Sequence, residues 1–237
     1  MSTQDLTFLS TRIYGKDRPF SGYLKVSDGQ IVSMGSGCPS DADAQVIDVG
    51  DSRVIPGLID IHLHGFMGLD MGSGAEEDVR KIAKALAERG TTAFQSTCST
   101  ASREQFNRFL PITKNLVDAP VYGARVIGAH LEGPFLNVAR KGAMAEEFII
   151  PPNLELTQEW MELSDGTITQ MTIAPEMPGA HEVIRYLATM GVTVSAGHTD
   201  ATYDQMLEAF RAGVSLACHT FNAMRPLSHR APGVPGA

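Results

Sequence analysis

The sequence contains no run of about 20 apolar residues, the length that a membrane-spanning helix requires. Residues 1–20 hold no basic segment followed by an apolar block, so they do not resemble a secretory signal. Cysteine is scarce, and the three present (Cys38, Cys98 and Cys218) form no C-x-x-C pair, which excludes a disulfide framework and a thiolate zinc site. We therefore expect a cytoplasmic globular protein without a membrane partner.

Basic residues are also in the minority, with 19 Lys and Arg against 27 Asp and Glu and a formal net charge of −8. A nucleic-acid-binding surface requires clustered Lys and Arg, so we expect no nucleic-acid partner. A small anionic substrate stays compatible with this charge, because one or two local arginines suffice to bind it. With 237 residues and 43% hydrophobic residues, the chain is long enough to bury a core.

Residues 1–53 have the pattern of short strands joined by turns. Asp28 and Gly29 separate two short apolar runs, and both residue types tolerate the positive φ angles of a tight hairpin turn. The pattern predicts a small, partial β-sandwich-like module over residues 1–53.

Residues 54–237 alternate between strand and helix patterns. Six strands are expected near 58–64, 91–98, 125–131, 168–174, 192–198 and 214–221, with five helices between them. We expect the helix over 103–117 to kink or end near Pro111. This α/β alternation predicts a parallel sheet, either an open six-stranded sheet or a TIM-like (β/α)8 barrel, which needs about 250 residues when complete. The position of the polar residues favours a barrel that is incomplete here, with about six β/α units.

Those polar residues lie at the carboxyl ends of the predicted strands. His62 and His64 end the first strand, Glu132 the third, His198 the fifth and His219 the sixth. Side chains at this rim of a parallel barrel converge on its mouth. Imidazoles with a carboxylate are typical ligands of zinc, iron and other divalent transition metals. The sequence therefore predicts a metal site holding one or two such ions.

Four segments carry a resemblance to a known family: PGLIDIHLHG, HLEGPFLN, SAGHTDA and CHTFNAM. Together they resemble the amidohydrolase superfamily and, within it, the N-acetylglucosamine-6-phosphate deacetylase family. The H-x-H pair is shared by many amidohydrolases, whereas HLEGP followed by GHT and HxxNAM is specific to the deacetylases. Members that carry a carboxylated lysine after strand four are set aside, because no lysine follows Lys141. Deaminase-like members stay open but would explain neither Arg230 nor the NAM segment.

The resemblance implies roles for individual residues. Glu132, His198 and His219 match the principal metal ligands, while His62 and His64 match the superfamily's second metal pair. Substrate contacts are implied for four further residues: Ala143 in the long loop, Asn222, Ala223, and Arg230 as the phosphate-binding arginine.

The implied reaction is metal-dependent hydrolysis of the N-acetyl group of N-acetylglucosamine 6-phosphate, giving glucosamine 6-phosphate and acetate. In the family an aspartate at the end of strand eight carries the proton, and it is expected beyond Ala237, so no catalytic base is named. We accordingly expect a fragment of a longer, homodimeric enzyme. Two alternatives stay open: an inactive fragment that still binds metal or sugar phosphate, and an N-acetylgalactosamine-6-phosphate deacetylase.

Overall fold

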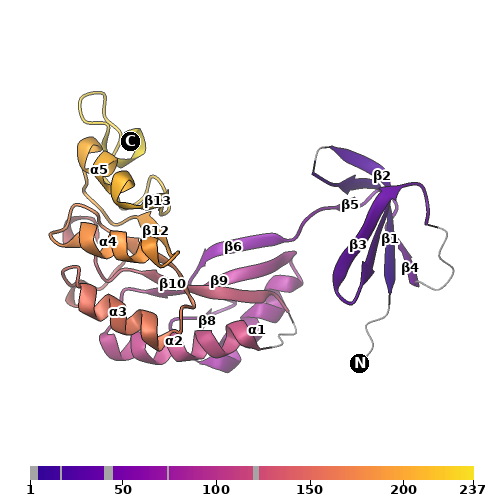
Figure 1. Cartoon of the computed structure of the whole chain (residues 1–237), viewed down its shortest axis with the longest axis horizontal. Coiled ribbons are helices and arrows are strands. Elements are labelled where there is room, and N and C mark those ends of the chain that lie inside the picture. Colours follow the sequence, from indigo (N-terminus) through magenta and orange to yellow (C-terminus); the bar gives the residue numbers. More distant parts are fainter. Residues whose placement is uncertain (1–4, 17, 40–44, 74, 120–122) are drawn as a thin grey trace. The chain divides into compact units, whose positions relative to one another are not determined.

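The computed structural model describes residues 5–16, 18–39, 45–73, 75–119 and 123–237. The chain divides into two compact units, Met1–Gly57 and Leu58–Ala237 (Figure 1). No helix in these described ranges is both long and apolar enough to cross a bilayer. The predicted division of the chain between residues 53 and 54 stays a prediction.

The first unit is a five-stranded sheet with the order β3-β2-β1-β4 and with β5 paired to β1. Its strands are β1 (Leu6–Tyr14), β2 (Pro19–Ser27), β3 (Gln30–Ser36), β4 (Gln45–Asp48) and β5 (Arg53–Val54). The antiparallel pair β2–β3 turns at Asp28 and Gly29, whose φ angles are 49° and 73°. The predicted hairpin is therefore confirmed, and it forms because these two residue types accept the left-handed backbone that the turn requires.

The second unit is built on a six-stranded parallel sheet with the order β13-β12-β11-β10-β9-β6. The sheet curls, and helices cover its outer face (Figure 1). The strands are β6 (Leu58–Leu63), β9 (Thr91–Ser99), β10 (Arg125–Glu132), β11 (Ile168–Ile173), β12 (Thr193–Ala196) and β13 (Val214–Ala217). This arrangement fits a TIM-like barrel present over six β/α units.

Five helices alternate with these strands: α1 (Glu76–Ala87), α2 (Arg103–Asp118), α3 (Leu154–Leu163), α4 (Ala180–Thr189) and α5 (Tyr203–Ala212). Helix α5 shows how local sequence sets their bounds. Thr202 and Gln205 form a reciprocal capping box at its start, and Gly213, with a φ of 128°, follows its end. The smaller elements are the hairpin β7 (Gly65–Phe66) and β8 (Leu69–Asp70), the 3-10 turns η1 (Val138–Arg140) and η2 (Glu146–Phe148), and α6 (Gly233–Gly236).

Helix α2 does not end at Pro111 but continues to Asp118, so of the two expected outcomes the end is wrong and the kink stays a prediction. Its first turn is capped by Ser102, whose hydroxyl accepts a hydrogen bond from the Gln105 amide. A proline inside a helix costs about 3 kcal/mol or more. Residues on both sides of this one are fully buried and offset that cost: Phe106, Phe109, Leu110 and Leu116.

The core lies between the sheet and its helices. One apolar cluster joins α2 to α5 with strands β10 to β13, and a second joins α1 with β9 and β10. Because both clusters lie on the outer face of the sheet, the carboxyl ends of the strands stay free to carry polar groups.

Candidate metal centre

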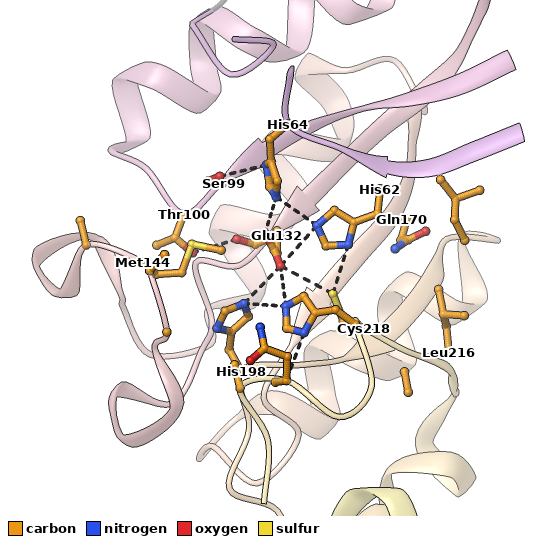
Figure 2. Close-up of a pocket in the computed structure, with 18 residues that line it drawn as sticks. His62, His64, Ser99, Thr100, Glu132, Met144, Gln170, His198, Leu216 and Cys218 are labelled. Carbon is orange, nitrogen blue, oxygen red and sulfur yellow. Dashed lines mark hydrogen bonds and ion pairs between the residues drawn. The ribbon is translucent and has the colours of Figure 1, made fainter. Parts of the chain in front are cut away.

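The polar residues named from the sequence meet where the parallel strands end (Figure 2). His62 is the penultimate residue of β6 and His64 lies just beyond that strand, while Glu132 is the last residue of β10. His198 follows β12 by two residues and His219 follows β13 by two. The structure therefore brings together five side chains that lie up to 157 residues apart in the chain.

The backbone bends sharply where two of these histidines leave their strands. His198 and His219 have φ angles of 48° and 30°, in the left-handed region that non-glycine residues seldom occupy. Residues held in this region cost about 1–3 kcal/mol each and concentrate at functional sites. Gly197 leaves no room for a side chain, because a Cβ there would lie 2.5 Å from Cys218 Cβ and 2.8 Å from Thr172 Cγ2.

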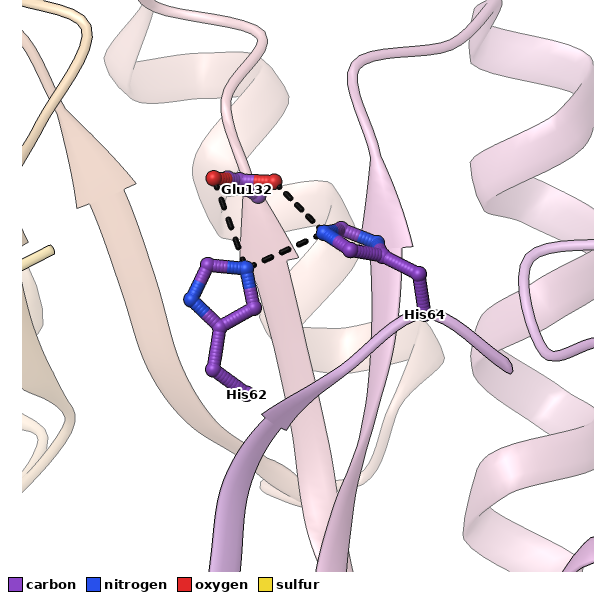
Figure 3. A group of neighbouring side chains, drawn as sticks. All are labelled: His62, His64 and Glu132. Atoms are coloured by element: carbon purple, nitrogen blue, oxygen red, sulfur yellow. Dashed lines mark hydrogen bonds and ion pairs between the residues drawn. The ribbon is translucent and has the colours of Figure 1, made fainter. Parts of the chain in front are cut away.

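Glu132 is the centre of the cluster and is only 1% exposed. Its Oε1 lies 3.1 Å from Nε2 of His198, 3.1 Å from Nε2 of His219 and 3.4 Å from Nε2 of His62. Its Oε2 lies 2.9 Å from Nε2 of His64 (Figure 3). All four imidazoles thus direct the same ring nitrogen toward one buried carboxylate.

Two groups in this cluster have the geometry of a metal site. In each of the triads Glu132–His198–His219 and His62–His64–Glu132, the ligand atoms lie within 4.8 Å of one another. Glu132 Oε2 is buried and, among the described residues, receives no well-directed hydrogen bond, and its one close polar neighbour is Nε2 of His64. Nitrogen and carboxylate donors at these distances suit a divalent transition metal.

The proton affinities of these groups depend strongly on one another. Burial opposes ionisation of Glu132, but its close contacts with the four imidazoles, His198 and His219 foremost, hold its pKa far below the usual range. Hydrogen bonds to Cys218 and Glu132 raise the pKa of His219 to about 10. Burial alone would lower the pKa of His62, yet contacts with the same two residues raise it to about 9. In the metal-free protein these rings are therefore protonated at neutral pH, so a metal must displace protons to bind.

His130 lies beneath the cluster and does not join it. It is fully buried, and its ring packs edge-on to that of His62 with centroids 4.8 Å apart. Its nitrogens meet the hydroxyls of Thr97 at 3.3 Å and Thr172 at 2.9 Å. Burial and the neighbouring imidazoles lower the pKa of His130 to about 3, so this ring stays neutral.

The cluster opens into a pocket of about 840 Å³. Three of the four residues predicted to contact substrate line it: Ala143, Asn222 and Ala223. Arg230 is exposed and does not line the pocket. The roles of all four residues stay predictions.

Four further residues line the pocket, and two of them, Ser99 and Gln170, were not identified from the sequence. Ser99, at the end of β9, places its hydroxyl 3.0 Å from Nδ1 of His64. Cys218 is 3% exposed, and its Sγ lies 3.5 Å from Nδ1 of His62. Gln170 and Met144 also line the pocket. The position of Ser99 at the end of a predicted strand could have indicated a pocket residue, but serine is common at strand ends that carry no site.

Comparison with known proteins agrees with this geometry. Residues 53–234 match the profile of the amidohydrolase family. A curated protein of Lysinibacillus sphaericus is 35% identical over 222 residues, which cover 94% of this chain and 57% of the relative. A second, from Bacillus subtilis, is 36% identical over 220 residues, which cover 91% of this chain and 56% of the relative. Both are named N-acetylglucosamine-6-phosphate deacetylase.

Solved structures with the same protein name are also similar. A mutant of the deacetylase of Mycobacterium smegmatis, in complex with N-acetyl-D-glucosamine-6-phosphate, superposes with a TM-score of 0.89 at 33% identity, covering 99% of this chain and 60% of that chain. The enzyme of Pasteurella multocida superposes with a TM-score of 0.87 at 30% identity. The match covers 98% of this chain and 61% of that chain. The predicted incomplete TIM-like barrel is thereby confirmed. The chain spans about half the length of the curated relatives it matches, with 57% and 56% for these two.

Proposed function

This chain belongs to the amidohydrolase family, and we propose that it carries the metal centre and part of the substrate pocket of an N-acetylglucosamine-6-phosphate deacetylase. The reaction is hydrolysis of the N-acetyl amide of N-acetylglucosamine 6-phosphate to glucosamine 6-phosphate and acetate. One observation carries the proposal: four imidazole Nε2 atoms surround one buried carboxylate, Glu132, at the mouth of a parallel barrel.

Glu132, His198 and His219 would hold one divalent ion such as zinc or iron, and His62 with His64 and Glu132 would hold a second. These residues would thereby gain Lewis-acid chemistry, which would polarise a carbonyl oxygen and activate water as a nucleophile near neutral pH. Hydrogen bonds from Nδ1 to backbone carbonyls orient the rings of His198 and His219, so the bound amide would meet groups already in place.

The pocket supports a substrate of this size. Its volume of about 840 Å³ lies within the range of about 300–1,000 Å³ that is usual for small-molecule sites. Ala143 and Ala223 are small and leave room beside the centre, while the Asn222 amide can hydrogen-bond a sugar hydroxyl or phosphate. Arg230 is proposed as a phosphate anchor, because a guanidinium forms paired hydrogen bonds with phosphate.

The test measures acetate release from N-acetylglucosamine 6-phosphate by the 237-residue chain loaded with zinc or iron. Parallel reactions use unphosphorylated N-acetylglucosamine and N-acetylgalactosamine 6-phosphate as substrates, and Glu132→Gln and His219→Ala as variants. Metal-dependent turnover of the gluco phosphate that both variants abolish is the expected result.

Calorimetric binding of the same sugar phosphate separates the other outcomes. Binding without turnover would replace the hydrolytic proposal with the alternative of an inactive, sugar-phosphate-binding chain. Neither binding nor turnover by a folded, metal-loaded sample would overturn the proposal altogether. Faster turnover of the galacto substrate would reassign the substrate and leave the reaction in place.

A further inference from the structure

Two loops at the mouth of the barrel supply residues that line the pocket. The first pocket loop, residues 137–145 after β10, supplies four of them, and the second pocket loop, residues 219–225 beyond β13, supplies three. The two loops approach each other, because a Cβ added at Gly142 would lie 3.6 Å from Cβ of Ala223. The shape of the pocket at this point therefore depends on how firmly the loops are held together.

A short segment beyond β12, residues 198–200, bonds to both pocket loops through its backbone. The carbonyl oxygen of His198 accepts from the Asn137 amide at 2.9 Å, and that of Thr199 accepts from the Arg225 amide at 3.1 Å. Segment 198–200 is thus a fixed point from which a side chain can hold both loops.

Asp200 is the side chain that does so. Its Oδ1 accepts from Nε of Arg140, in the first pocket loop, at 2.8 Å and lies 2.7 Å from Nη2 of the same guanidinium. Its Oδ2 accepts from Nη2 of Arg225, in the second pocket loop, and Nε of Arg225 donates to the Asp200 carbonyl oxygen at 2.8 Å. One carboxylate therefore joins a guanidinium from each loop, through hydrogen bonds between ionised partners that are about twice as strong as neutral ones.

Burial and charge set the strength of this link. The Asp200 side chain is 27% exposed and each arginine side chain is 35% exposed, so solvent screens the ion pairs in part. An ion pair of this kind contributes a factor of about 1.4–5 to an equilibrium constant. Without the carboxylate, the two guanidinium groups would repel each other. Neither Asp200 nor the two arginines line the pocket, so they act on it only through the loops they hold.

We propose that Asp200 is a positioning residue of the pocket: through Arg140 and Arg225 it ties the two pocket loops together, and it thereby sets the affinity of the pocket for a sugar phosphate. This inference rests on the proposed function, because the ligand is the substrate proposed there. The ligand binds only molecules in which both loops are in place, so the apparent dissociation constant rises as that fraction falls.

Asp200→Asn is the decisive variant, because it keeps the size of the side chain and removes the charge that both guanidinium groups share. Calorimetry on the 237-residue chain measures binding of N-acetylglucosamine 6-phosphate with zinc kept saturating, so that a change in metal affinity does not enter. With two ion pairs lost, the dissociation constant should rise by about 2–30-fold. Hydrogen exchange followed by mass spectrometry should become faster over both pocket loops and stay unchanged over helix α4.

Matched variants separate positioning from a general loss of stability. Asp165→Asn removes a surface ion pair of the same kind, with Lys114 at 2.8 Å, away from the pocket lining, and it should change neither measurement. Arg140→Gln should weaken sugar-phosphate binding, whereas Arg140→Lys keeps a cation there and should recover most of it. Asp200→Asn combined with Arg140→Gln should weaken binding by less than the product of the single effects, because both changes break the same contact.

Unchanged exchange over the pocket loops in Asp200→Asn, or unchanged binding of the sugar phosphate, would overturn the inference. Equal effects of Asp200→Asn and Asp165→Asn would also overturn it, because loss of any surface ion pair would then suffice. A wild-type chain that binds zinc but no sugar phosphate would overturn the proposed function and, with it, the ligand named here. Faster exchange confined to the two loops would in that case still support Asp200 as the residue that positions them.

Discussion

The change from Glu132 to Gln offers a direct test of how the centre is built, because this residue belongs to both candidate triads. The substitution keeps the shape of the side chain and removes its negative charge. Oε1 would lose its charge-assisted contacts with three imidazoles, and Oε2 would lose its contact with the fourth. We expect the variant to lose tight binding of divalent metal.

The magnitude follows from linkage between binding and folding. A ligand at about 100 times its dissociation constant adds about 2.7 kcal/mol to the free energy of unfolding when only the folded state binds it. For a protein of about 150–250 residues, each kcal/mol shifts the thermal midpoint by about 2–4 °C. Zinc at that concentration should therefore raise the midpoint of the wild-type chain by about 5–11 °C, and that of Glu132→Gln by a small fraction of this.

Differential scanning fluorimetry or calorimetry with and without zinc measures this shift within each protein, so any effect of the substitution on basal stability cancels. Glu176→Gln is the matched control, because Glu176 is a part-buried carboxylate that bonds to Asn137 and the Asp200 amide and does not line the pocket. It should keep the full zinc-dependent shift. A full shift in Glu132→Gln would place the stabilising metal elsewhere and refute the reasoning.

Two further predictions concern pH and packing. The pKa values of His62 and His219 are raised in the folded state to about 9 and about 10, so their stabilising contribution is complete below about pH 6.5 and is lost as the pH rises through the folded values. The thermal midpoint of metal-free protein should therefore fall from pH 7 to pH 9, with a flatter profile in His219→Ala; a midpoint that rises over this range would contradict the assignment. Gly197→Ala would press a Cβ against Cys218 and Thr172, so it should cost about 1–3 kcal/mol in denaturant unfolding and weaken zinc binding through His198. Gly35→Ala, where the nearest atom would be 3.5 Å away, is its control, and equal stability of the two variants would show that the contact is relieved cheaply.

Much of the fold could be predicted because local patterns and the tertiary structure agree. Six apolar runs become the six parallel strands, and capping residues such as Thr202 mark where helices begin. Pro111 is the exception, since the intrinsic cost of a proline in a helix is visible in the sequence while the burial that offsets it is not. That burial depends on tertiary contacts with the sheet and with other helices, such as that of Phe106 with Trp160 of α3.

The clustering of the candidate ligands could also be anticipated, for a topological reason. His62, Glu132 and His219 each lie within two residues of the carboxyl end of a strand, and parallel strands in a barrel bring those ends to one rim. The same residue types scattered over helices would not have predicted that the side chains meet. Their roles as ligands, like a cytoplasmic location, stay predictions that the experiments above address in part.

The partners that orient the rings could not be found in this way. The Arg140 and Asn222 groups that hold His198 and His219 are backbone carbonyls, which every residue possesses, so no residue type marks them. The Arg140 carbonyl reaches His198 from 58 residues away, and the Asn222 carbonyl reaches His219 through the local turn at that residue, whose φ is 30°. The two side-chain partners, Ser99 and Cys218, are residue types that can form hydrogen bonds. Only their contacts with His64 and His62 distinguish them from other polar residues near strand ends. Sequence thus identifies side chains able to bind a metal, whereas the structure is needed to learn which groups orient their rings.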